Sequence, residues 1–520
     1  MSRAEIYGFM RLISGLRPFL SSTLTAEEST GLIREWIRQR EDRFLKKVEE
    51  AVFQYPSSPY QKLMQYAGCS LGDLRELVVN EGLDGALEQL RDAGVYVGWE
   101  EMKGREEMRR GSWSCSFHES DFNNPIISPH YMSTSGGTSG APVRIPIDLE
   151  DHVQSAPDWA FLFQEYGFMN EPLIFWTPAH TSMANRYLRC AKFGKKFTKW
   201  FLLAGIPSFS GRLRSVAVHS AIRFIGGFPR AEAAPVHQLD RVAEFLMEQL
   251  KSGQKPVVNT PPSAAAALST EVQKQGASLQ GVSFLLGAEP VTAARRKTIE
   301  SSGARAIPTY GTTEAGWIGA QFPDDTIADE VRIFRDAYAV VSRSDGGGLH
   351  AGPLPMLFTN LRPAGPKVLI NAELGDSGVL AGTECNDRAA EIGYDLRIHN
   401  IRSFRKVTAW GVTLALADLY TVLEEDMPRA FGAGVGDFQL IEEQNEKGIS
   451  GLQLRVKPHV RASDSQLKKV FCREISGKRL YYRAMAEILN EAGALRIQRD
   501  NPIATPAGKT LPVILRRYAE

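Results

Sequence analysis

The sequence lacks an excess of charge and any cluster of cysteines. Its 61 Lys and Arg residues nearly balance its 60 Asp and Glu residues, so the net charge is only +1. That balance gives no electrostatic basis for binding nucleic acid or an anionic membrane surface. The five cysteines lie far apart and form no Cys-x-x-Cys pair. This spacing argues against a zinc site and more strongly against a disulfide framework, and it suits a reducing cytoplasm.

Long apolar runs and a secretory leader are also missing. The first residues do not show the basic-then-apolar order of a signal peptide. The apolar run at 201–209 is far too short to span a bilayer. With 43% hydrophobic and 23% charged residues, the composition is ordinary for a soluble globular protein. We therefore expect a cytoplasmic protein of about two to four domains.

Helical patterns dominate residues 1–110. A capping-box pattern at Thr25–Glu28 precedes apolar residues at helical spacing, and the prolines at 56–59 interrupt the pattern. Two short helices are predicted near 70–77 and 85–94. No residue of this part suggests chemistry, so we expect a helical platform or lid at the N-terminal end of a larger domain.

Residues 111–402 alternate between strand and helix patterns and form the predicted core. Helices are expected at 151–164 and 238–250, and buried strands begin near 172, 256, 282 and 306. Such alternation predicts an α/β fold with a largely parallel sheet, followed by a more β-rich piece at 321–400. Ligands of open α/β sheets bind beyond the carboxyl ends of the strands, where this sequence has small polar loops.

The pattern changes again at about residue 403. Helices are predicted at 414–425 and 480–492, with strands at 438–441 and 452–456. These elements suit a compact α+β domain spanning 403–520, close to the common size of a domain.

A glycine-rich stretch at 133–142 is the most unusual segment of the chain. Eight of its ten residues are Gly, Ser or Thr, and a β-branched run follows it. Consecutive backbone amides and hydroxyls suit the oxygens of a polyphosphate, although such runs are also typical of linkers. No lysine follows a glycine in this loop, which argues against the P-loop of kinases and NTPases.

Further small motifs follow in order along the chain. They are Gly287–Pro290, the segment Tyr310-Gly311-Thr312-Thr313-Glu314, Asp376 beside Gly375 and Gly378 in a predicted turn, Arg402 nine residues before Gly411, and Pro506–Lys509. Most are weak singly, since a Gly-Asp or Gly-Lys pair occurs by chance in any protein. The segment that begins at Tyr310 is more specific. Because all the motifs occur in one characteristic order, the set is stronger evidence for a function than any single motif.

Together these motifs resemble the adenylate-forming superfamily, which includes acyl-CoA synthetases, aryl-acid ligases and peptide-synthetase adenylation domains. The resemblance covers roughly residues 55–515 and is greatest to the phenylacetate–CoA ligase and acyl-protein synthetase branch. It implies a large N-terminal α/β domain with mixed and parallel sheets, and a small mobile α+β C-terminal domain. It also implies conversion of a carboxylic acid and ATP to an acyl-adenylate, then acyl transfer to the thiol of CoA or a carrier protein.

The resemblance implies a role for each motif. Ser135, Gly136, Gly137, Thr138, Ser139 and Gly140 would hold the ATP phosphates. Ala288, Glu289 and Pro290 would lie beside adenine with Gly311, Thr312 and Thr313, and Tyr310 would stack on the ring. Glu314 would bind Mg²⁺, Asp376 the ribose hydroxyls, and Arg402 would lie at the domain junction. Lys509 would bridge the carboxylate and the α-phosphate, with Glu314 and Thr138 also assigned to catalysis. The acid pocket candidates are Trp176, His180, Pro262 and Ser263.

Several departures and alternatives remain open. The loop ends Pro142-Val143-Arg144, where the family usually has Pro-Lys, so Arg144 is a candidate replacement. Phe404 stands at the usual hinge position, and of the cysteine-rich metal element of some phenylacetate ligases only Cys385 is present nearby. Purely structural roles are also open for the key residues. Glu314 could be a carboxylate at a helix start, Asp376 a turn residue and Lys509 a solvated lysine. Arg402 could form a surface ion pair, and His180 could be a packed structural histidine. Alternative functions are an adenylate-former with an amine, nitrite-derived or protein acceptor, and a non-catalytic nucleotide-binding scaffold.

Overall fold

A computed structural model describes most of the chain. The described residues are 3–134, 144–178, 183–203, 213–235, 237–343, 354–383, 385–403, 406–410, 412–434, 436–444, 449–478, 482–503 and 512–515. The candidate phosphate loop at 135–143, His180, Phe404, Gly411 and Lys509 lie outside them.

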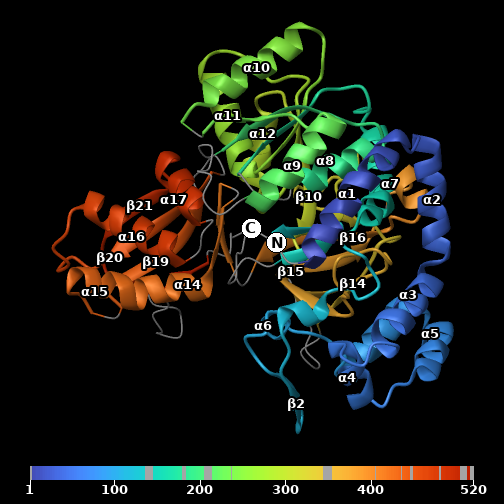
Figure 1. The fold of residues 1–520 in the computed structure, drawn as a ribbon. Helices are drawn as coiled ribbons and strands as arrows, with labels where there is room; N and C mark the ends of the chain where they lie inside the picture. Colours follow the sequence, from blue (N-terminus) through green and yellow to red (C-terminus); the bar gives the residue numbers. More distant parts are fainter. Residues whose placement is uncertain are drawn as a thin grey trace.

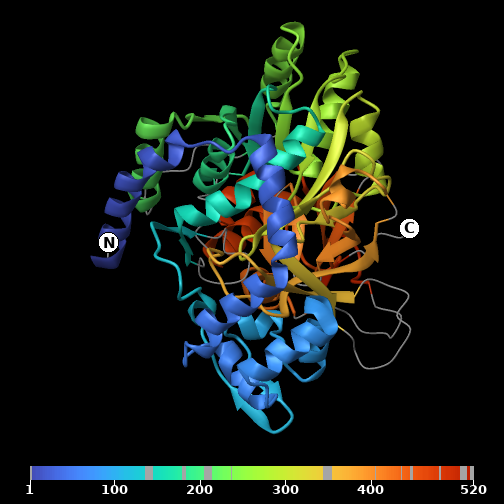
Figure 2. The same ribbon diagram turned by 90° about the vertical axis from the view of Figure 1, so that its right-hand side faces the viewer.

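Helices make up most of the N-terminal part, as the apolar spacing predicts. They are α1 (Arg3–Ser21), α2 (Ala26–Arg38), α3 (Arg40–Val48), the π-helix η1 (Glu49–Phe53), α4 (Pro59–Tyr66), α5 (Leu71–Asp92) and α6 (Trp99–Met102). Thr25 forms the predicted capping box with Glu28, and Ser70 forms another with Asp73. The two short helices predicted at 70–94 form one element, α5, which is interrupted at Gly82, where φ is 67°. Figure 2 shows α1 beside α9 (Leu213–Gly226), although the two are far apart in sequence.

One twelve-stranded sheet runs through the core. Its order is β13 (Tyr338–Ser342), β14 (Leu354–Asn360), β15 (Ala372–Gly382), β16 (Leu396–Ser403), β12 (Val331–Ile333), β11 (Gly316–Ala320), β10 (Arg305–Thr312), β9 (Ser283–Leu286), β8 (Val257–Thr260), β5 (Leu173–Thr177), β6 (Phe197–Leu202) and β7 (Ala231–Ala233). The strands from β10 to β7 are parallel, and those from β13 to β10 are antiparallel. The alternating segment thus forms the predicted parallel strands, and the β-rich segment that follows extends the same sheet with antiparallel strands.

Helices cover both faces of the parallel half (Figure 1). On one face α10 (Leu239–Lys251), α11 (Pro262–Lys274) and α12 (Ala293–Glu300) bury their apolar residues against Ile174, Trp176 and Phe284. On the other, α7 (Leu149–Glu165), α8 (Met183–Lys192) and α9 pack against Phe175 and Leu285. Because side chains alternate along a strand, neighbouring residues of β5 belong to opposite layers. Buried on both faces, these strands are almost continuously apolar, as parallel strands usually are.

The C-terminal elements form a second, smaller sheet with helices, drawn in orange and red in Figure 1. They are β17 (Lys406–Ala409), β18 (Val412–Ala415), α14 (Leu416–Thr421), the π-helix η3 (Val422–Asp426), α15 (Met427–Phe431), β19 (Phe438–Gln444), β20 (Ser450–Val456), α16 (Asp464–Lys478), α17 (Tyr482–Glu491), β21 (Leu495–Arg499) and β22 (Val513–Ile514). The sheet order is β21-β20-β19-β22. The predicted helix at 414–425 starts two residues late, because Leu414 and Ala415 pair with β17.

Two short hairpins and two small helices complete the chain. The hairpins are β1 (Met108–Arg110) with β2 (Trp113–Cys115), and β3 (Tyr131–Thr134) with β4 (Arg144–Ile147); the helices are the 3₁₀ helix η2 (Glu119–Phe122) and α13 (Arg388–Glu391). Thr134 pairs with Arg144, so both ends of the candidate phosphate loop are anchored side by side. Of the helices that the structure describes, none is long and apolar enough to cross a membrane.

Close packing between β11 and β12 supports a first prediction. Gly319 faces the neighbouring backbone so closely that an added Cβ would overlap the Arg332 carbonyl oxygen. We expect Gly319→Ala to lower the free energy of unfolding by about 1–3 kcal/mol, because backbone atoms must move to make room. Urea denaturation followed by tryptophan fluorescence measures this loss.

A matched control lies within α2. A Cβ on Gly31 would meet nothing within 4 Å, so Gly31→Ala should be neutral or stabilise the helix by about 0.5–1 kcal/mol. Equal effects of the two substitutions would contradict this account of the β11–β12 packing.

Candidate functional site

A hydrogen bond joins two of the predicted motifs across the sheet. The Tyr310 hydroxyl donates to Asp376 Oδ2 at 3.0 Å, and both residues are buried. Tyr310 is on β10 and Asp376 on β15, with β11, β12 and β16 between them. Four steps of about 4.8 Å would separate these strands by roughly 19 Å in a flat sheet, beyond the reach of a tyrosine. The antiparallel half must therefore curl so that β15 returns toward β10.

Asp376 lies within a strand, and its predicted turn is wrong. Gly375 has a φ of 86°, and the pairing registers of β15 with both β14 and β16 shift nearby. The glycines thus accommodate bulges in a long strand rather than a reversal of the chain. Asp376 pairs in register with Ser403, the last residue of β16. The aspartate therefore lies next to the start of the C-terminal elements.

A tight hairpin holds the Tyr310–Glu314 segment. Gly311 pairs with Trp317 and Thr312 with Gly316, so Thr313 and Glu314 lie in the turn. The Thr312 hydroxyl accepts from the Ala315 amide at 3.2 Å. A Cβ on Gly311 would lie 2.5 Å from the Gly316 carbonyl oxygen. Glycine is therefore required at 311 for the hairpin to close, and closure sets the position of Glu314.

Glu314 belongs to a buried charge cluster. Its Oε1 lies 2.6 Å from Lys103 Nζ, which also lies 2.5 Å from Glu119 Oε1. Only 2% of the Lys103 side chain is exposed, and the ammonium group stands 4.6 Å from the centre of the Trp99 ring. Burial lowers the pKa of Lys103, but the charges of Glu314 and Glu119 outweigh it, and the pKa rises above its usual value. Lys367 Nζ also lies 4.0 Å from Glu119 Oε1, so two lysines face the two glutamates.

Lys103 is a site residue that the sequence did not reveal. It follows α6 in the helical part to which no chemistry was assigned, and no local pattern distinguishes it from other surface-type lysines. Its partner Glu314 is far away along the chain, so only the tertiary structure brings the two together.

The electrostatics link Tyr310, Asp376 and Glu314. Burial raises the pKa of the Tyr310 hydroxyl well above its usual value, and the charges of Asp376 and Glu314 raise it further. The tyrosine therefore stays neutral and donates its proton to Asp376. The described residues include no group of three or more His, Cys, Asp or Glu side chains suited to a metal. The donor set still fits a Mg²⁺ ion that takes one protein carboxylate, Glu314, and completes its shell with phosphate oxygens and water.

Arg402 lies one residue from Ser403 but on the other face of the strand. It pairs in register with Ser377, and its Nη1 contacts Asp329 Oδ2 at 3.1 Å. The structure thus contains the ion pair that was the structural alternative for this arginine. Its role at the domain junction stays a prediction.

The loop after β9 contributes a buried ion pair. Ala288 has a φ of 69°, unusual for a residue with a side chain. Glu289 Oε2 lies 2.9 Å from Arg295 Nη2 and accepts from the Ser263 hydroxyl at 2.5 Å, and the side chains of Glu289 and Arg295 are fully buried. Arg295 also donates to the Pro290 carbonyl oxygen. These contacts brace the loop between α11 and α12, and its place beside adenine stays a prediction.

The described pocket candidates are all in the interior. Trp176 is fully buried, and its Nε1 donates to the Ala234 carbonyl oxygen at 2.9 Å. Pro262 and Ser263 are buried at the start of α11. Arg144, the candidate replacement for the loop lysine, is ion-paired with Glu5 of α1. The assignments of the phosphate loop, His180 and Lys509 concern residues outside the described ranges and stay predictions.

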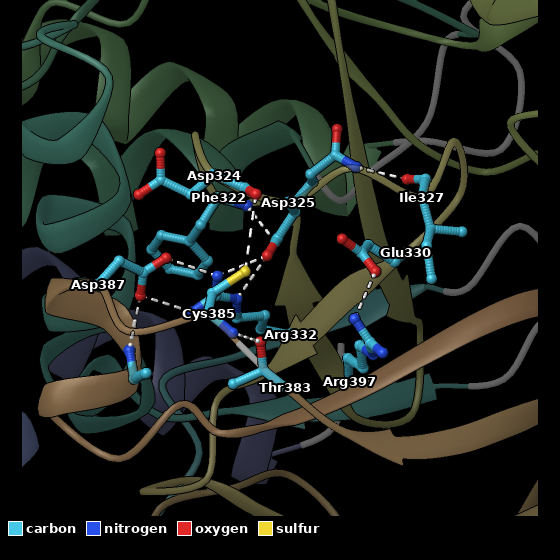
Figure 3. Close-up of polar contacts among 12 residues, drawn as sticks. Phe322, Asp324, Asp325, Ile327, Glu330, Arg332, Thr383, Cys385, Asp387 and Arg397 are labelled. Carbon is cyan, nitrogen blue, oxygen red and sulfur yellow. Dashed lines mark hydrogen bonds and ion pairs between the residues drawn. The ribbon is translucent and has the colours of Figure 1, made fainter.

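Cys385 lies near a dense polar network rather than in a cysteine cluster. Figure 3 shows Arg332, fully buried, between Asp325 and Asp387, at 2.6 Å from each carboxylate. The Cys385 thiol contacts the Asp324 carbonyl oxygen at 3.6 Å. Arg397 and Glu330 form a further ion pair at 3.5 Å. This network connects β12, β16, α13 and the loop before β12.

The fold, with its curled sheet and a smaller C-terminal part, is similar to that of a solved CoA ligase. Among solved structures, the chain is similar to 2-hydroxyisobutyryl-CoA ligase in complex with 2-HIB-AMP and CoA. The identity is 14%, the alignment covers 96% of this chain and 91% of that chain, and the TM-score is 0.56. At this identity, the similarity establishes the fold alone.

Two more distant similarities have TM-scores below 0.5 and support no argument. One is to o-succinylbenzoate CoA synthetase from Bacillus subtilis, with 13% identity, coverage of 74% of this chain and 68% of that chain, and a TM-score of 0.44. The other is to an amide bond synthetase from Marinactinospora thermotolerans, with 13% identity, coverage of 91% and 92%, and a TM-score of 0.43. No protein-family model and no curated protein matches the chain.

The charge cluster supports a second prediction. Lys103→Met removes the cation that Glu314 and Glu119 share and leaves the buried Glu314 carboxylate without it, so we expect a loss of about 3 kcal/mol in unfolding free energy at pH 8. In the wild type, the raised pKa of Lys103 means that its contribution persists at all lower pH values and is lost only as pH rises through that pKa. In the variant, the two carboxylates acquire raised pKa values, so part of the lost stability returns as pH falls toward 5.

Urea denaturation at pH 5 and pH 8 measures both effects. Lys62→Met, at an exposed position of α4, is the control and should change little at either pH. A Lys103 variant whose loss was the same at both pH values would contradict the assigned role of the two carboxylates.

Proposed function

We propose that this protein is an ATP-dependent ligase that activates a carboxylic acid as an acyl-adenylate, releases pyrophosphate and transfers the acyl group to a thiol. The fold supports the general class, because the similar solved structure is a CoA ligase. Function requires a site as well as a fold. The site is therefore the basis of the proposal.

The observation that carries the proposal is the hydrogen bond between Tyr310 and Asp376. These residues belong to two motifs far apart in sequence, and they meet only because the sheet curls. The resemblance assigns the tyrosine to adenine and the aspartate to the ribose hydroxyls, which are adjacent parts of one nucleotide. Tyr310 is on β10, and Glu314 lies in the turn that follows this strand. A carboxylate at that position would hold Mg²⁺ beside the phosphates. Their proximity is what one bound ATP would need.

The remaining roles follow from chemistry. Residues 135–140 would hold the phosphates through amides and hydroxyls, with Thr138 among them, and Thr312, Thr313 and Gly311 would line the adenine side. Mg²⁺, when bound, offsets the charge of the α-phosphate and of the leaving pyrophosphate. Lys509 would align the acid carboxylate with the α-phosphate and stabilise the charge that develops there.

CoA is the acceptor that we favour. The similar ligase was solved with an acyl-adenylate and CoA in its thioester-forming state, and a carrier-protein thiol has the same chemistry. We further propose that residues 403–520 rotate between the two half-reactions. In the structure, Gln444 of β19 hydrogen-bonds Thr292, and Ser450 of β20 accepts from Arg295. A rotation of this part would have to break these contacts.

Removal of the Asp376 carboxylate gives a third prediction. Asp376→Ala deletes the acceptor for the ribose hydroxyls and leaves the Tyr310 hydroxyl without its partner. We expect the KM for ATP to rise by about a hundredfold, because two charge-assisted hydrogen bonds are lost. ATP–pyrophosphate exchange with a panel of carboxylic acids measures it. Asp92→Ala, at an exposed position, is the control, and an unchanged KM for ATP in Asp376→Ala would refute the ribose assignment.

The proposed catalytic lysine gives a fourth prediction. Lys509→Ala should reduce pyrophosphate exchange by at least about a hundredfold while changing the KM for ATP little, because Lys509 acts on the transition state. A preformed acyl-adenylate should still be consumed by CoA in the variant. Normal exchange in this variant with an acid that the wild type accepts would rule out the assignment.

A further inference from the structure

Helix α8 presents a positive side chain to the face of the sheet that it covers. Arg186 Nη1 donates to Asn259 Oδ1 at 2.7 Å, and Asn259 Nδ2 donates to the Leu285 carbonyl oxygen at 3.2 Å. The second bond sets the orientation of the Asn259 amide, so its oxygen faces the guanidinium. Asn259 is the penultimate residue of β8, so Arg186 lies near the carboxyl end of that strand, the edge at which α/β sheets bind ligands.

Arg186 also lies beside the hairpin that contains Glu314. Its guanidinium carbon stands 6.0 Å from the centre of the Trp317 ring and 5.8 Å from that of Phe175. Trp317 follows Gly316, the first residue after the hairpin turn. Arg189, one turn further along α8, lies close to Gly316 as well. The arginine is thus next to the candidate site, in partly apolar surroundings, and it is only partly buried.

No carboxylate among the described residues pairs with Arg186. Arginines that are buried have such partners: Arg332 lies between two aspartates (Figure 3), Arg295 pairs with Glu289, and Arg362 with Asp158. Burial, together with the like charge of Arg189, lowers the pKa of Arg186 to about 10, and only Cys190 acts in the opposite direction.

The segments outside the described ranges that flank these elements do not supply the missing charge. Residues 135–143, 179–182 and 204–212 contain no Asp or Glu. A positive charge in partly apolar surroundings without an acidic partner is poorly stabilised. Such a group is expected where a ligand provides the opposite charge, and a guanidinium is suited to bind a carboxylate with two hydrogen bonds.

We propose that Arg186 binds a second carboxylate of the acid substrate, so that the preferred substrates are dicarboxylic acids. This inference rests on the proposed ligase function. The carboxylate to be activated reacts at the α-phosphate, which the proposal places with Glu314 and Lys509. The other carboxylate reaches Arg186, and the half-buried ring of Trp317 lies beside the carbon chain between them.

A binding experiment tests this inference without turnover. Thermal melting is measured with pairs of acids of equal carbon number or ring: glutarate and pentanoate, adipate and hexanoate, terephthalate and benzoate. Wild type should be stabilised most by one of the dicarboxylates, and Arg186→Gln should lose that stabilisation. Without ligand, Arg186→Gln should melt at or above the wild-type temperature, because it removes an unpaired charge, whereas Arg332→Gln should melt lower.

Kinetics provide the second measurement. In ATP–pyrophosphate exchange, Arg186→Gln should lower kcat/KM for the preferred dicarboxylate by about a hundredfold and for its monocarboxylate partner by less than about threefold, with the KM for ATP unchanged. Arg461→Gln, at an exposed position, should leave all three values unchanged.

The outcomes separate the two proposals. Exchange with none of the acids, together with dicarboxylate stabilisation that requires Arg186, would support the binding site and refute the ligase function for these acids. Two results would overturn the inference, since Arg186 would then not bind a second carboxylate. One is a wild-type preference for monocarboxylates. The other is an equal loss of kcat/KM in Arg186→Gln for both acids of a pair. A ligand-free Arg186→Gln variant as unstable as Arg332→Gln would overturn it as well, by assigning the arginine a structural role.

Discussion

The hydrogen bond from Tyr310 to Asp376 depends on the curvature of the large sheet. Three strands separate β10 from β15, and only a curled sheet brings a hydroxyl on one to a carboxylate on the other. Along the curled half, glycines stand where the backbone is most crowded or irregular. Gly319 allows β11 and β12 to approach, Gly311 lets the hairpin close, and Gly375 permits the bulges in β15. The candidate nucleotide site is therefore a product of backbone geometry before any side chain contributes chemistry.

The charged groups in and near the interior differ in whether they have a carboxylate partner. The buried arginines 295, 332 and 362 each have a carboxylate partner, and each connects elements that are distant in sequence. Lys103 likewise joins the helical N-terminal part to the hairpin through Glu314, and two carboxylates keep it charged. Arg186 differs, because an asparagine and two aromatic rings surround it in place of an acid. Among these charged groups, Arg186 is thus the one beside the motif residues that has no acidic partner among the described residues.

Much of the organisation could be predicted from the sequence because local rules determine it. The capping boxes, the breaks at the prolines and at Gly82, and the buried strands beginning near 172, 282 and 306 follow from side-chain spacing and backbone preference. Errors arose where pairing between distant strands decides the outcome. The Asp376 position is predicted as a turn because nearby glycines usually mark turns, whereas pairing with β14 and β16 makes it part of a strand.

The sequence by itself determined the order and chemistry of the motifs, since Tyr310, Glu314, Asp376 and Lys509 are recognisable as residue types at characteristic spacings. The tertiary structure alone decided which of the described groups meet. It placed Tyr310 against Asp376, put Arg402 on the opposite face of its strand, and brought Lys103 to Glu314 and Arg186 to the neighbouring hairpin. Contacts of this kind depend on how strands twist and helices pack over long sequence separations, and no local pattern of residues encodes them.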